Sequence, residues 1–565
     1  MNRARYAFVL ALFAAVAAAH AQHEPWYDPD PLPQGMTEEE VLRRHEIGLG
    51  FAPTPPPGGP IRNVAEFERS EAVLIRYPLG IPLALVAALS EHVRVITLVS
   101  GPAQETQARA AYQGAGVQMA NAAFLHAPTN SIWTRDYGPF YVADADGRIA
   151  VVDFVYNRPR PDDDAVPAAL AAYLGVPFYA MDLVHTGGNY MTDSRGVSAS
   201  TDLVWEENGF DQSLVIQRMH DYLGVHTYHV TLDPQDTYLK HIDTWAKFLD
   251  VDKVLIAAVP PSDPHYDEHE AVAAYFASQN SAYGTPYEVV RVYTPGGEPY
   301  TNALIVNERV YVPVVGSPWD DDALAVYEAA MPGYEVRAFT GSWLSTDALH
   351  CRVKEVPDTG MLSLLHRPLA DEVPYRPEIS LDVDIVAHSG QPLHEDELFL
   401  IYRVDEAPFD TLALQPVGGP TFSASLPVPP GGGVEIAYYF SAADASGRAE
   451  RFPLVGPAGA RTVHILPQPV GAEPEVAGAG FRLDAVYPNP ASGAVTVRFA
   501  LGAPGPVALD VFDGLGRRVA RLHDGPLAAG PHRVRWAAGA VPSGVYLVRL
   551  VGAEGQAVRR VVVRR

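Results

Sequence analysis

Residues 72–99 of this chain, AVLIRYPLGIPLALVAALSEHVRVITLV, contain two short β-branched runs on either side of an alanine-rich stretch. The runs at 72–77 and 93–99 are typical of buried strands, and residues 82–91 between them predict a helix. A strand, a helix and a strand in this order indicate an α/β domain. Further strand-like runs follow at residues 149–155, 253–259, 289–293 and 303–306. We therefore expect one α/β domain of catalytic size over residues 61–370.

Beyond this domain the strands continue without helices, separated by glycine and proline turns. The runs lie at residues 379–387, 397–402, 421–426, 434–440 and 462–465. Short strands at this spacing predict a β-sandwich of immunoglobulin type over residues 371–466, although the cysteine pair typical of that fold is absent. We expect residues 467–480 to be a linker and residues 481–565 to form a second, smaller β-sandwich.

Charge separates the last of these parts from the others. The chain has 565 residues, a formal net charge of −26 and an isoelectric point near 5.1. This is too long for one small module and too acidic for a protein whose main partner is nucleic acid. Between Arg482 and Arg565, however, there are 12 arginines against 5 acidic residues. The C-terminal part is therefore a module of its own.

The first 21 residues have the features of a secretory signal peptide. Arg3 and Arg5 precede an apolar run, and Ala19-His20-Ala21 provides a small-x-small cleavage site before Gln22. An uncleaved anchor is the alternative. No later stretch of about 18 residues is both uncharged and predominantly apolar, so we expect no transmembrane segment. Residues 22–60 are rich in proline and lack apolar periodicity, which predicts a lead segment or linker.

Four segments of the α/β domain concentrate polar side chains: WTRDYGP at residues 133–139, HTGGN at 185–189, KHIDTW at 240–245 and ALHC at 348–351. The last segment ends on Cys351, the single cysteine, which is either a buried apolar side chain or a reactive thiol. His241 and Asp243 project to one face if their segment is extended. Asp136, beside a Gly-Pro turn, could simply cap that turn. Together, a thiol, an imidazole and two carboxylates supply a nucleophile, a proton shuttle and an anionic clamp.

In this order the four segments resemble the bacterial, porphyromonad-type peptidylarginine deiminases and their relatives, the agmatine deiminases. The resemblance covers about residues 61–370, and residues 240–248 and 347–351 are more similar to the peptidyl branch. It implies a pseudo-fivefold propeller of ββαβ units around the active site, followed by an immunoglobulin-like domain. The implied chemistry requires neither a metal ion nor another cofactor. His265 and His269 have a helical spacing that could bind zinc, but the sequence offers no clear third ligand.

The resemblance also assigns roles to individual residues. Cys351 is the expected nucleophile, and His241 is expected to donate and accept protons. Asp136 and Asp243 are expected to hold a guanidinium, and Asn302 to orient the site by hydrogen bonding. The remaining candidates are substrate-binding residues, Arg158, Arg160, Trp133, Tyr238 and Thr346.

Among these candidates, Arg158 and Arg160 resemble a pair that binds the carboxylate of a C-terminal arginine. Alternatively, they are solvated loop arginines that balance the charge of the three aspartates at residues 162–164. Trp133, Tyr238 and Thr346 are expected to line the arginine stem.

The C-terminal part resembles the sorting domain of the type IX secretion route. The resemblance rests on YPNP at residues 487–490, VFDGLGR at 511–517 and PSGVY at 542–546. It implies that the type IX machinery is a partner and that the protein is secreted or attached to the cell surface. A sugar-binding or adhesive β-sandwich is the alternative.

The expected activity is hydrolysis of arginine in peptides or proteins, in particular C-terminal arginine, to citrulline and ammonia. A covalent thiouronium on Cys351 is the implied intermediate. Three alternatives remain at this point: an exported agmatine deiminase, a cysteine peptidase or transamidase, and a non-catalytic surface protein that uses the fold for binding.

Overall fold

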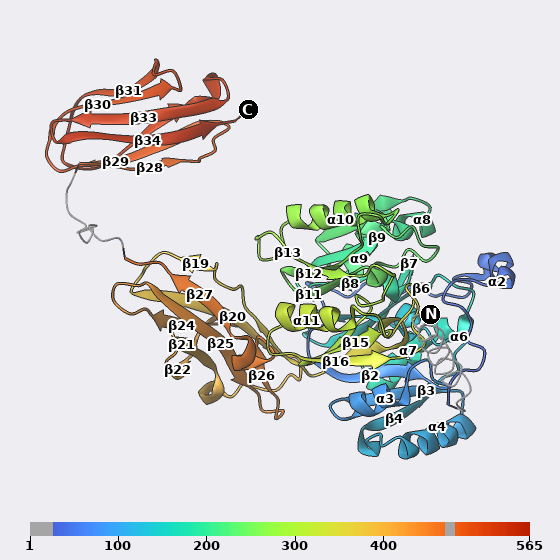
Figure 1. Ribbon diagram of the computed structural model, residues 1–565. Helices are drawn as coiled ribbons and strands as arrows, with labels where there is room; N and C mark the ends of the chain where they lie inside the picture. Colours follow the sequence, from blue (N-terminus) through green and yellow to red (C-terminus); the bar gives the residue numbers. More distant parts are fainter. Residues whose placement is uncertain (1–25, 469–480, 565) are drawn as a thin grey trace, which may run out of the picture. The chain divides into compact units, whose positions relative to one another are not determined.

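The computed structural model describes residues 26–468 and 481–564, so the predicted signal peptide and most of the predicted linker lie outside the described residues. The chain divides into two compact units between Gln468 and Pro469. The first unit contains an α/β part and a β-rich part, and the second contains strands β28 to β34 (Figure 1).

Residues 62–357 form five sheets of three or four strands. The first sheet contains β1 (Arg62–Asn63), β5 (Phe140–Ala143), β6 (Ile149–Tyr156) and β7 (Phe178–His185), and the second contains β8 (Met191–Thr192), β9 (Val197–Thr201) and β10 (Thr227–Thr231). The third contains β11 (Ala246–Asp250), β12 (Lys253–Ala258) and β13 (Glu288–Tyr293), and the fourth contains β14 (Leu304–Val306), β15 (Arg309–Val314) and β16 (Glu335–Thr340). The fifth contains β17 (Lys354–Pro357), β2 (Ser70–Arg76), β3 (Arg94–Val99) and β4 (Ala122–His126). Because β17 pairs with β2, the fifth sheet joins the end of the region to its beginning.

Each of these sheets repeats one pattern, in which an antiparallel strand pair is followed by a helical crossover to a parallel strand. The crossover helices are α3 (Leu83–Ser90), α4 (Pro102–Gly114), α6 (Pro161–Asp164), α7 (Val166–Leu174), α8 (Leu203–Glu207), α9 (Gln212–Leu223), α10 (Tyr266–Ser278) and α11 (Asp320–Ala330). Parallel strands require such crossovers, and their continuous apolar runs require cover on both faces. The predicted mixed α/β class is confirmed, while closure of the five units into a propeller stays a prediction.

The β-rich part of the first unit consists of two sheets that enclose one apolar core. One sheet contains β18 (Leu362–Leu365), β20 (Glu378–Ala387), β24 (Thr421–Pro427) and β23 (Gln415–Gly418). The other contains β19 (Glu372–Val373), β27 (Arg461–Ile465), β25 (Val434–Ala443), β21 (Phe399–Val404), β22 (Asp410–Ala413) and β26 (Ala449–Phe452). The first strand of the sandwich begins at Leu362, ahead of the expected boundary at residue 370, because Leu362 and Leu364 belong to its core. The immunoglobulin type of this sandwich stays a prediction.

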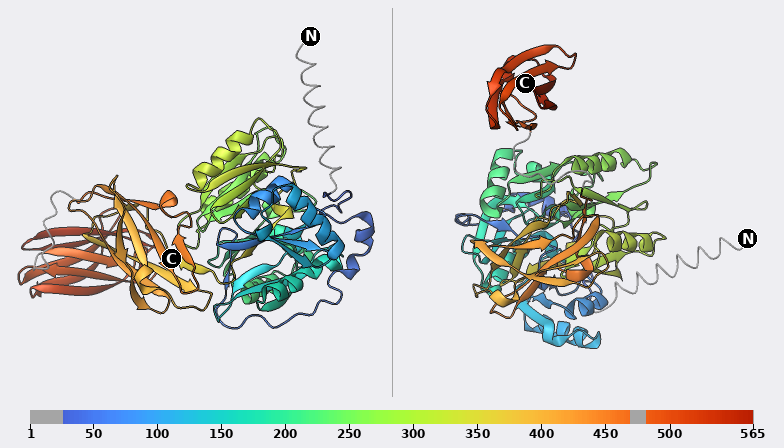
Figure 2. Two further views of the ribbon diagram at one scale, coloured as in Figure 1. Left: turned by 90° about the horizontal axis from the view of Figure 1, so that it is seen from below. Right: turned by 90° about the vertical axis from the view of Figure 1, so that its left-hand side faces the viewer.

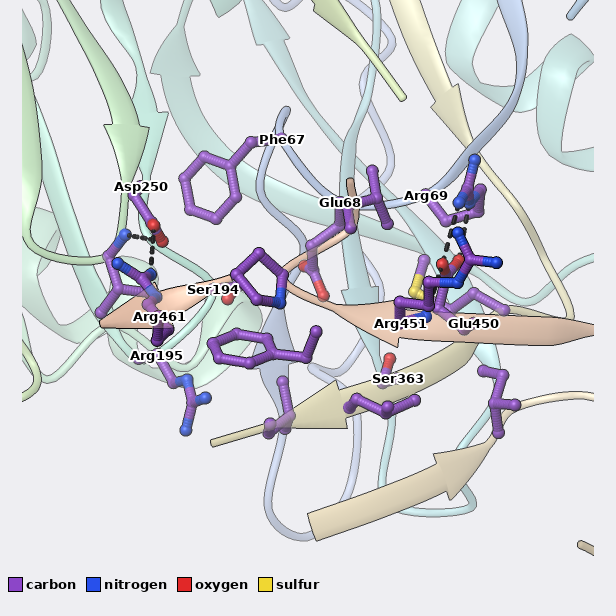
Figure 3. A pocket seen from close by; sticks show the side chains of 18 of the residues that line it. Phe67, Glu68, Arg69, Ser194, Arg195, Asp250, Ser363, Glu450, Arg451 and Arg461 are labelled. Carbon is purple, nitrogen blue, oxygen red and sulfur yellow. Dashed lines mark hydrogen bonds and ion pairs between the residues drawn. The ribbon is translucent and has the colours of Figure 1, made fainter. Parts of the chain in front are cut away.

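Ion pairs connect the β-rich part to the α/β part around a pocket of about 100 Å³ (Figure 3). Arg69 binds Glu450 at 2.6 and 2.8 Å and Glu308 at 2.9 Å. Arg461 binds Asp250 at 2.6 Å. Since partly buried guanidinium groups require such partners, the Arg69–Glu450 and Arg461–Asp250 pairs fix the β-sandwich against the start of β2 in the fifth sheet and against β11 in the third sheet.

The second unit consists mainly of strands, drawn in red in Figure 2. They are β28 (Arg482–Tyr487), β29 (Ala494–Leu501) and β32 (Gly530–Ala537) in one sheet, and β31 (Arg518–Leu527), β30 (Gly505–Asp513), β33 (Gly544–Gly552) and β34 (Gly555–Val563) in the other. Both sheets contribute to one core, which includes Val497, Phe499, Leu509 and Trp536. In the described parts of the chain, no helix combines the length and the apolar composition needed to cross a membrane.

Candidate active site

Cys351 lies in a short 3-10 turn, η5 (His350–Arg352), directly before β17, and its side chain is fully buried. Asn302 contacts it twice: Oδ1 accepts the Cys351 backbone N–H at 3.3 Å, and Nδ2 donates to the sulfur at 3.2 Å. The same Nδ2 is 3.2 Å from the backbone oxygen of Asp243. The amide of Asn302 therefore fixes the sulfur relative to the Asp243 segment.

Asp243 approaches the thiol from the 3-10 turn η4 (Ile242–Thr244), with its Oδ2 3.6 Å from the Cys351 sulfur. The same oxygen lies 2.7 Å from His350 Nδ1, and His350 Nε2 lies 2.9 Å from Glu66 Oε2. Lys247 donates to that Glu66 oxygen at 2.8 Å. A continuous row of carboxylate, imidazole, carboxylate and ammonium thus holds Asp243 in place.

This row of polar groups keeps two buried carboxylates ionised. Burial alone would raise the pKa of Asp243, but the hydrogen bond and charge of His350 outweigh it, so that the pKa lies below its ordinary value. Burial alone would also raise the pKa of Glu66. Lys247 and His350 outweigh it and hold the pKa of that carboxyl well below its usual range. Asp243 is therefore an anion beside the thiol at neutral pH.

His241 and Asp136 form a second pair of buried groups. Asp136 lies on α5 (Thr134–Tyr137), and its Oδ1 is 3.6 Å from His241 Nδ1. Gly188 lies beside both, because a Cβ added there would be 2.5 Å from His241 Nδ1 and 2.7 Å from Asp136 Oδ1. Only a residue without a side chain leaves the pair in this arrangement.

The backbone between His241 and Asp243 is a turn and not the extended segment that would place both side chains on one face. Lys240 has a φ of 51°, and η4 begins directly after His241. The strand β11 starts only at Ala246, so His241 and Asp243 lie in the turn that precedes it. The two side chains nevertheless interact electrostatically.

Burial shifts three groups of the site toward their neutral forms. It raises the pKa of Asp136 to about 8, and the charge of Asp243 adds to this effect. It lowers the pKa of His241 to about 3. Burial, followed by the charges of Asp243 and Asp136, raises the pKa of the Cys351 thiol well above its ordinary value. A cation placed among these groups would favour ionisation of both Asp136 and Cys351.

The buried polar atoms of the site without a hydrogen-bond partner among residues 26–468 and 481–564 include Asp136 Oδ1, Asp243 Oδ1 and His241 Nε2. Buried groups in this condition are rare, because each costs roughly 1–3 kcal/mol. Two of the atoms are carboxylate oxygens and can only accept when ionised. A planar cation with several N–H groups would satisfy them.

The residues expected to line the arginine stem differ in exposure. Trp133 is buried, and its Nε1 donates to the Leu32 backbone oxygen at 3.0 Å. Tyr238 is 72% exposed, and the neighbouring Thr346 side chain partly opposes the rise in the Tyr238 pKa that burial causes. The ring of Tyr238 also covers Gly35, where an added Cβ would lie 2.5 Å from it. Trp133 and Tyr238 therefore both contact the segment that precedes the α/β part.

Arg158 and Arg160 are buried, so their interpretation as solvated loop arginines is wrong. Arg158 Nε donates to the Gln34 backbone oxygen at 3.1 Å. Arg160 binds the Glu40 carboxylate at 2.7 and 3.0 Å and also donates to the backbone oxygens of Pro33 and Gly35. The nearby Asp163 accepts hydrogen bonds from Ser131 and Asn130, and its charge also acts on Arg160. Both arginines bind the N-terminal segment.

Four residues of this site received no role from the sequence: Gln34, Glu66, Lys247 and His350. Lys247 and His350 lie in or beside the polar segments at residues 240–248 and 348–351, so the sequence could have identified them as residues of the site. Glu66 contacts them only through the fold. Gln34 lies in the proline-rich segment, yet its Nε2 donates to Asp136 Oδ2 at 3.0 Å and lies 3.4 Å from His241 Nδ1. No local pattern distinguishes Gln34 or Glu66 from ordinary polar residues.

We expect Gly188→Ala to lower kcat of the reaction at this site about 100-fold while the chain stays folded. The added methyl group must displace His241 and Asp136, and a misplacement of about 1 Å costs roughly 100-fold in rate. Steady-state kinetics and a thermal midpoint measure the two effects separately. Gly114→Ala at the end of α4 is the matched control, because its methyl group meets open space. Normal activity of Gly188→Ala would mean that the His241–Asp136 geometry does not matter.

Comparison with known sequences relates both parts of the chain to families. The Porphyromonas-type peptidyl-arginine deiminase family matches residues 64–357, and the secretion system C-terminal sorting domain matches residues 485–564. An agmatine deiminase of Medicago truncatula is 26% identical over 149 residues, which cover 21% of this chain and 40% of the plant protein. The chain thus spans about two fifths of the length of the curated relatives it matches.

Two solved structures are similar to about half of the chain. A candidate arginine deiminase of Porphyromonas gingivalis is 23% identical, with a TM-score of 0.47, and the match covers 53% of this chain and 99% of that chain. An agmatine deiminase of Enterococcus faecalis is 19% identical, with a TM-score of 0.48, and the match covers 54% of this chain and 100% of that chain.

The sorting domain points to export by the type IX secretion route and to a location in the medium or at the cell surface. The deiminase match extends over more than half of the chain and includes every segment that contributes Asp136, His241, Asp243 and Cys351. On this evidence the chain belongs to the Porphyromonas-type peptidyl-arginine deiminase family.

Proposed function

We propose that this protein hydrolyses the guanidinium group of peptide arginine, in particular C-terminal arginine, to citrulline and ammonia. The proposal rests on two buried carboxylates, Asp136 and Asp243, each with an oxygen that lacks a partner among the described residues, beside the buried thiol of Cys351. A guanidinium stays charged and donates pairs of parallel N–H bonds to carboxylates. Held by both aspartates, its central carbon would be positioned for attack by the sulfur.

In the proposed reaction the Cys351 thiol gives its proton to His241, and the thiolate attacks the central guanidinium carbon. The tetrahedral adduct then breaks one C–N bond, and His241 returns the proton so that the nitrogen leaves as ammonia. A thiouronium remains on Cys351. Water attacks the same carbon while His241 removes one of its protons. The C–S bond then breaks, His241 returns that proton to the sulfur, and the second proton of the water leaves to solvent, which yields citrulline and restores the thiol. Asn302, which donates to the sulfur at 3.2 Å, stabilises the thiolate.

The substrate's charge is an essential part of this scheme. Burial and two neighbouring aspartates raise the pKa of Cys351, so the thiol alone is a weak nucleophile at neutral pH. A bound guanidinium opposes the charges of both aspartates and lowers the free energy of the thiolate. The site therefore favours cationic amidine substrates over neutral amides, which argues against a cysteine peptidase or transamidase.

Peptide and agmatine substrates differ at the far end of the arginine. Arg160 already binds one carboxylate, that of Glu40, through two of its nitrogens. A C-terminal arginine would offer a carboxylate to Arg158 and Arg160, whereas agmatine has none. Agmatine hydrolysis is the second candidate, because the Medicago truncatula relative is named an agmatine deiminase.

Three substrates distinguish these candidates: a peptide ending in arginine, the same peptide with an amidated C-terminus, and agmatine. We expect citrulline and ammonia from the first, with a much lower kcat/KM for the other two. Turnover of agmatine alone would favour the second candidate. Cleavage of the peptide without citrulline would reject deimination altogether.

We expect the double substitution Arg158→Ala/Arg160→Ala to raise KM for the peptide ending in arginine at least about 10-fold, since each charge-assisted hydrogen bond contributes about 1.5–3 kcal/mol. KM for agmatine should not rise, because agmatine lacks the carboxylate. Initial rates over a substrate series measure both constants. Arg148→Ala is the matched control, because the Arg148 side chain is 54% exposed and its ion pairs are with Asp144 and Asp146 of the same turn. An equal rise of KM for both substrates would mean that the pair supports the fold and not carboxylate recognition.

A further inference from the structure

The N-terminal segment of the described chain, residues 26–60, crosses the candidate active site between two anchors, and we call it the strap. At its start the Asp28 N–H donates to the Leu79 backbone oxygen at 3.0 Å, and the Asp28 carboxylate binds Arg76 at 2.7 Å. Near its end the Thr54 N–H donates to the Ala180 backbone oxygen, in β7, at 3.0 Å. Between the anchors lies the helix α2 (Glu38–Leu42). The strap is therefore anchored to the first unit on both sides of α2.

Gln34 inserts into the site between these anchors. Its side chain is buried, and its Nε2 donates to Asp136 Oδ2 at 3.0 Å and lies 3.4 Å from His241 Nδ1. A carboxamide is planar and carries an NH₂ group, so it resembles one arm of a guanidinium. It carries no charge, and its carbonyl carbon cannot take the place of a guanidinium carbon in the reaction. Gln34 therefore occupies the position of a substrate without being one.

Glu40 makes the second contact, on α2. Its carboxylate binds Arg160 Nε at 2.7 Å and Nη2 at 3.0 Å, and Arg160 is 2% exposed. Arg158 Nε binds the backbone oxygen of Gln34 itself. The two arginines proposed to recognise a substrate carboxylate are thus both bound to the strap.

The strap satisfies the site less completely than an arginine would. Among the residues the structure describes, Gln34 Oε1, Asp136 Oδ1 and Asp243 Oδ1 are buried without a hydrogen-bond partner. A guanidinium offers five N–H groups and a full charge, so it would reach acceptors that the carboxamide leaves unpaired. A substrate can therefore compete with the strap for the same atoms, and the contact is reversible.

We propose that the strap holds this protein in a self-blocked state, in which Gln34 occupies the guanidinium subsite and Glu40 the carboxylate subsite of the substrate arginine. The inference rests on the proposed function, from which it takes the two subsites. Displacement of the strap must precede binding of the substrate. The observed affinity is therefore the affinity of the open site multiplied by the fraction of molecules in which the strap is displaced.

The test compares two double variants of the full chain. Gln34→Ala/Glu40→Gln removes the Gln34 contact and the charge of the Glu40 contact, whereas Glu38→Gln/Glu39→Gln changes two exposed residues of the same helix. Glutamine at position 40 still fits the capping box that Glu40 forms with Thr37, so α2 keeps its first turn. One readout is the rate at which iodoacetamide alkylates Cys351, followed by mass spectrometry. The other is kcat/KM for citrulline release from a peptide ending in arginine.

We expect Gln34→Ala/Glu40→Gln to be alkylated at least about 10-fold faster than the control and to gain at least about 10-fold in kcat/KM, mainly through a lower KM. Equal alkylation rates in the two variants would overturn the self-block. Faster alkylation without any citrulline would support the self-block and reject the proposed function. Citrulline release at equal rates, with equal alkylation, would support the function and reject the self-block.

A second comparison covers the case in which the double variant unfolds early. Glu40→Gln alone removes the charge that binds Arg160, and Glu39→Gln is its control. Amide hydrogen exchange over residues 35–41 should be at least about 10-fold faster in Glu40→Gln, because the strap opens more often. Unchanged exchange would overturn the proposal independently of any activity.

Discussion

The Cys351→Ala variant is expected to release neither citrulline nor ammonia above the background rate, a loss of at least about 10⁴-fold. Cys351 is the only cysteine of the chain, so no other thiol can form the covalent intermediate. Citrulline and ammonia released from a peptide ending in arginine are measured together, since deimination must produce them in equal amounts.

Binding distinguishes loss of chemistry from loss of the site. Because Asp136 and Asp243 remain in Cys351→Ala, the variant should still bind the peptide in calorimetry. Acid quenching of the unchanged enzyme during turnover should trap a covalent adduct on Cys351, and the variant should show none. A residual rate within about 10-fold of the unchanged enzyme would place the nucleophile elsewhere and reject the mechanism.

The sequence predicted the α/β elements well because they depend on local patterns. The runs at residues 72–77 and 93–99 correspond to β2 and β3, and residues 82–91 correspond to α3, with shifts of one or two residues at the ends. Strands covered on both faces must be continuously apolar, so they are visible without knowledge of their neighbours. The sequence also predicted a family, which the match over residues 64–357 confirms.

The site itself could be predicted only as separate segments. Asp136 and Cys351 are more than 200 positions apart, and the sheets that carry them meet only in the folded chain. The positions of Glu66 and Gln34 depend on this same packing. Gln34 in particular lies in a proline-rich stretch whose lack of periodicity predicted a linker, because segments that bind through a few polar contacts need no apolar repeat. The β-sandwich begins before residue 371 because β18 pairs with β20, and the pattern of a single strand does not show which strand it will pair with.

Asp136 links the stability of the fold to pH in a direction opposite to that of most aspartates. Its pKa is about 8 in the folded chain, against 3.8 for an ordinary aspartate. Between these values the folded chain keeps a proton that the unfolded chain has lost. Stability therefore falls as the pH rises from about 4 to about 8, by up to about 1.4 kcal/mol per pH unit. His241 acts in the opposite direction, because its pKa is lowered to about 3 and stability falls as the pH drops below 6.5.

We expect Asp136→Asn to lower kcat/KM about 100- to 1000-fold and to raise the free energy of unfolding at pH 8. Asparagine keeps an oxygen for Gln34 but carries no charge for a guanidinium, and it removes the cost of ionising a buried carboxyl. The gain over the unchanged enzyme should be small at pH 5 and larger at pH 8 in urea unfolding. Asp146→Asn, whose side chain is 73% exposed, is the matched control and should show no such trend. A gain independent of pH would contradict a protonated Asp136, and full activity would remove Asp136 from the guanidinium clamp.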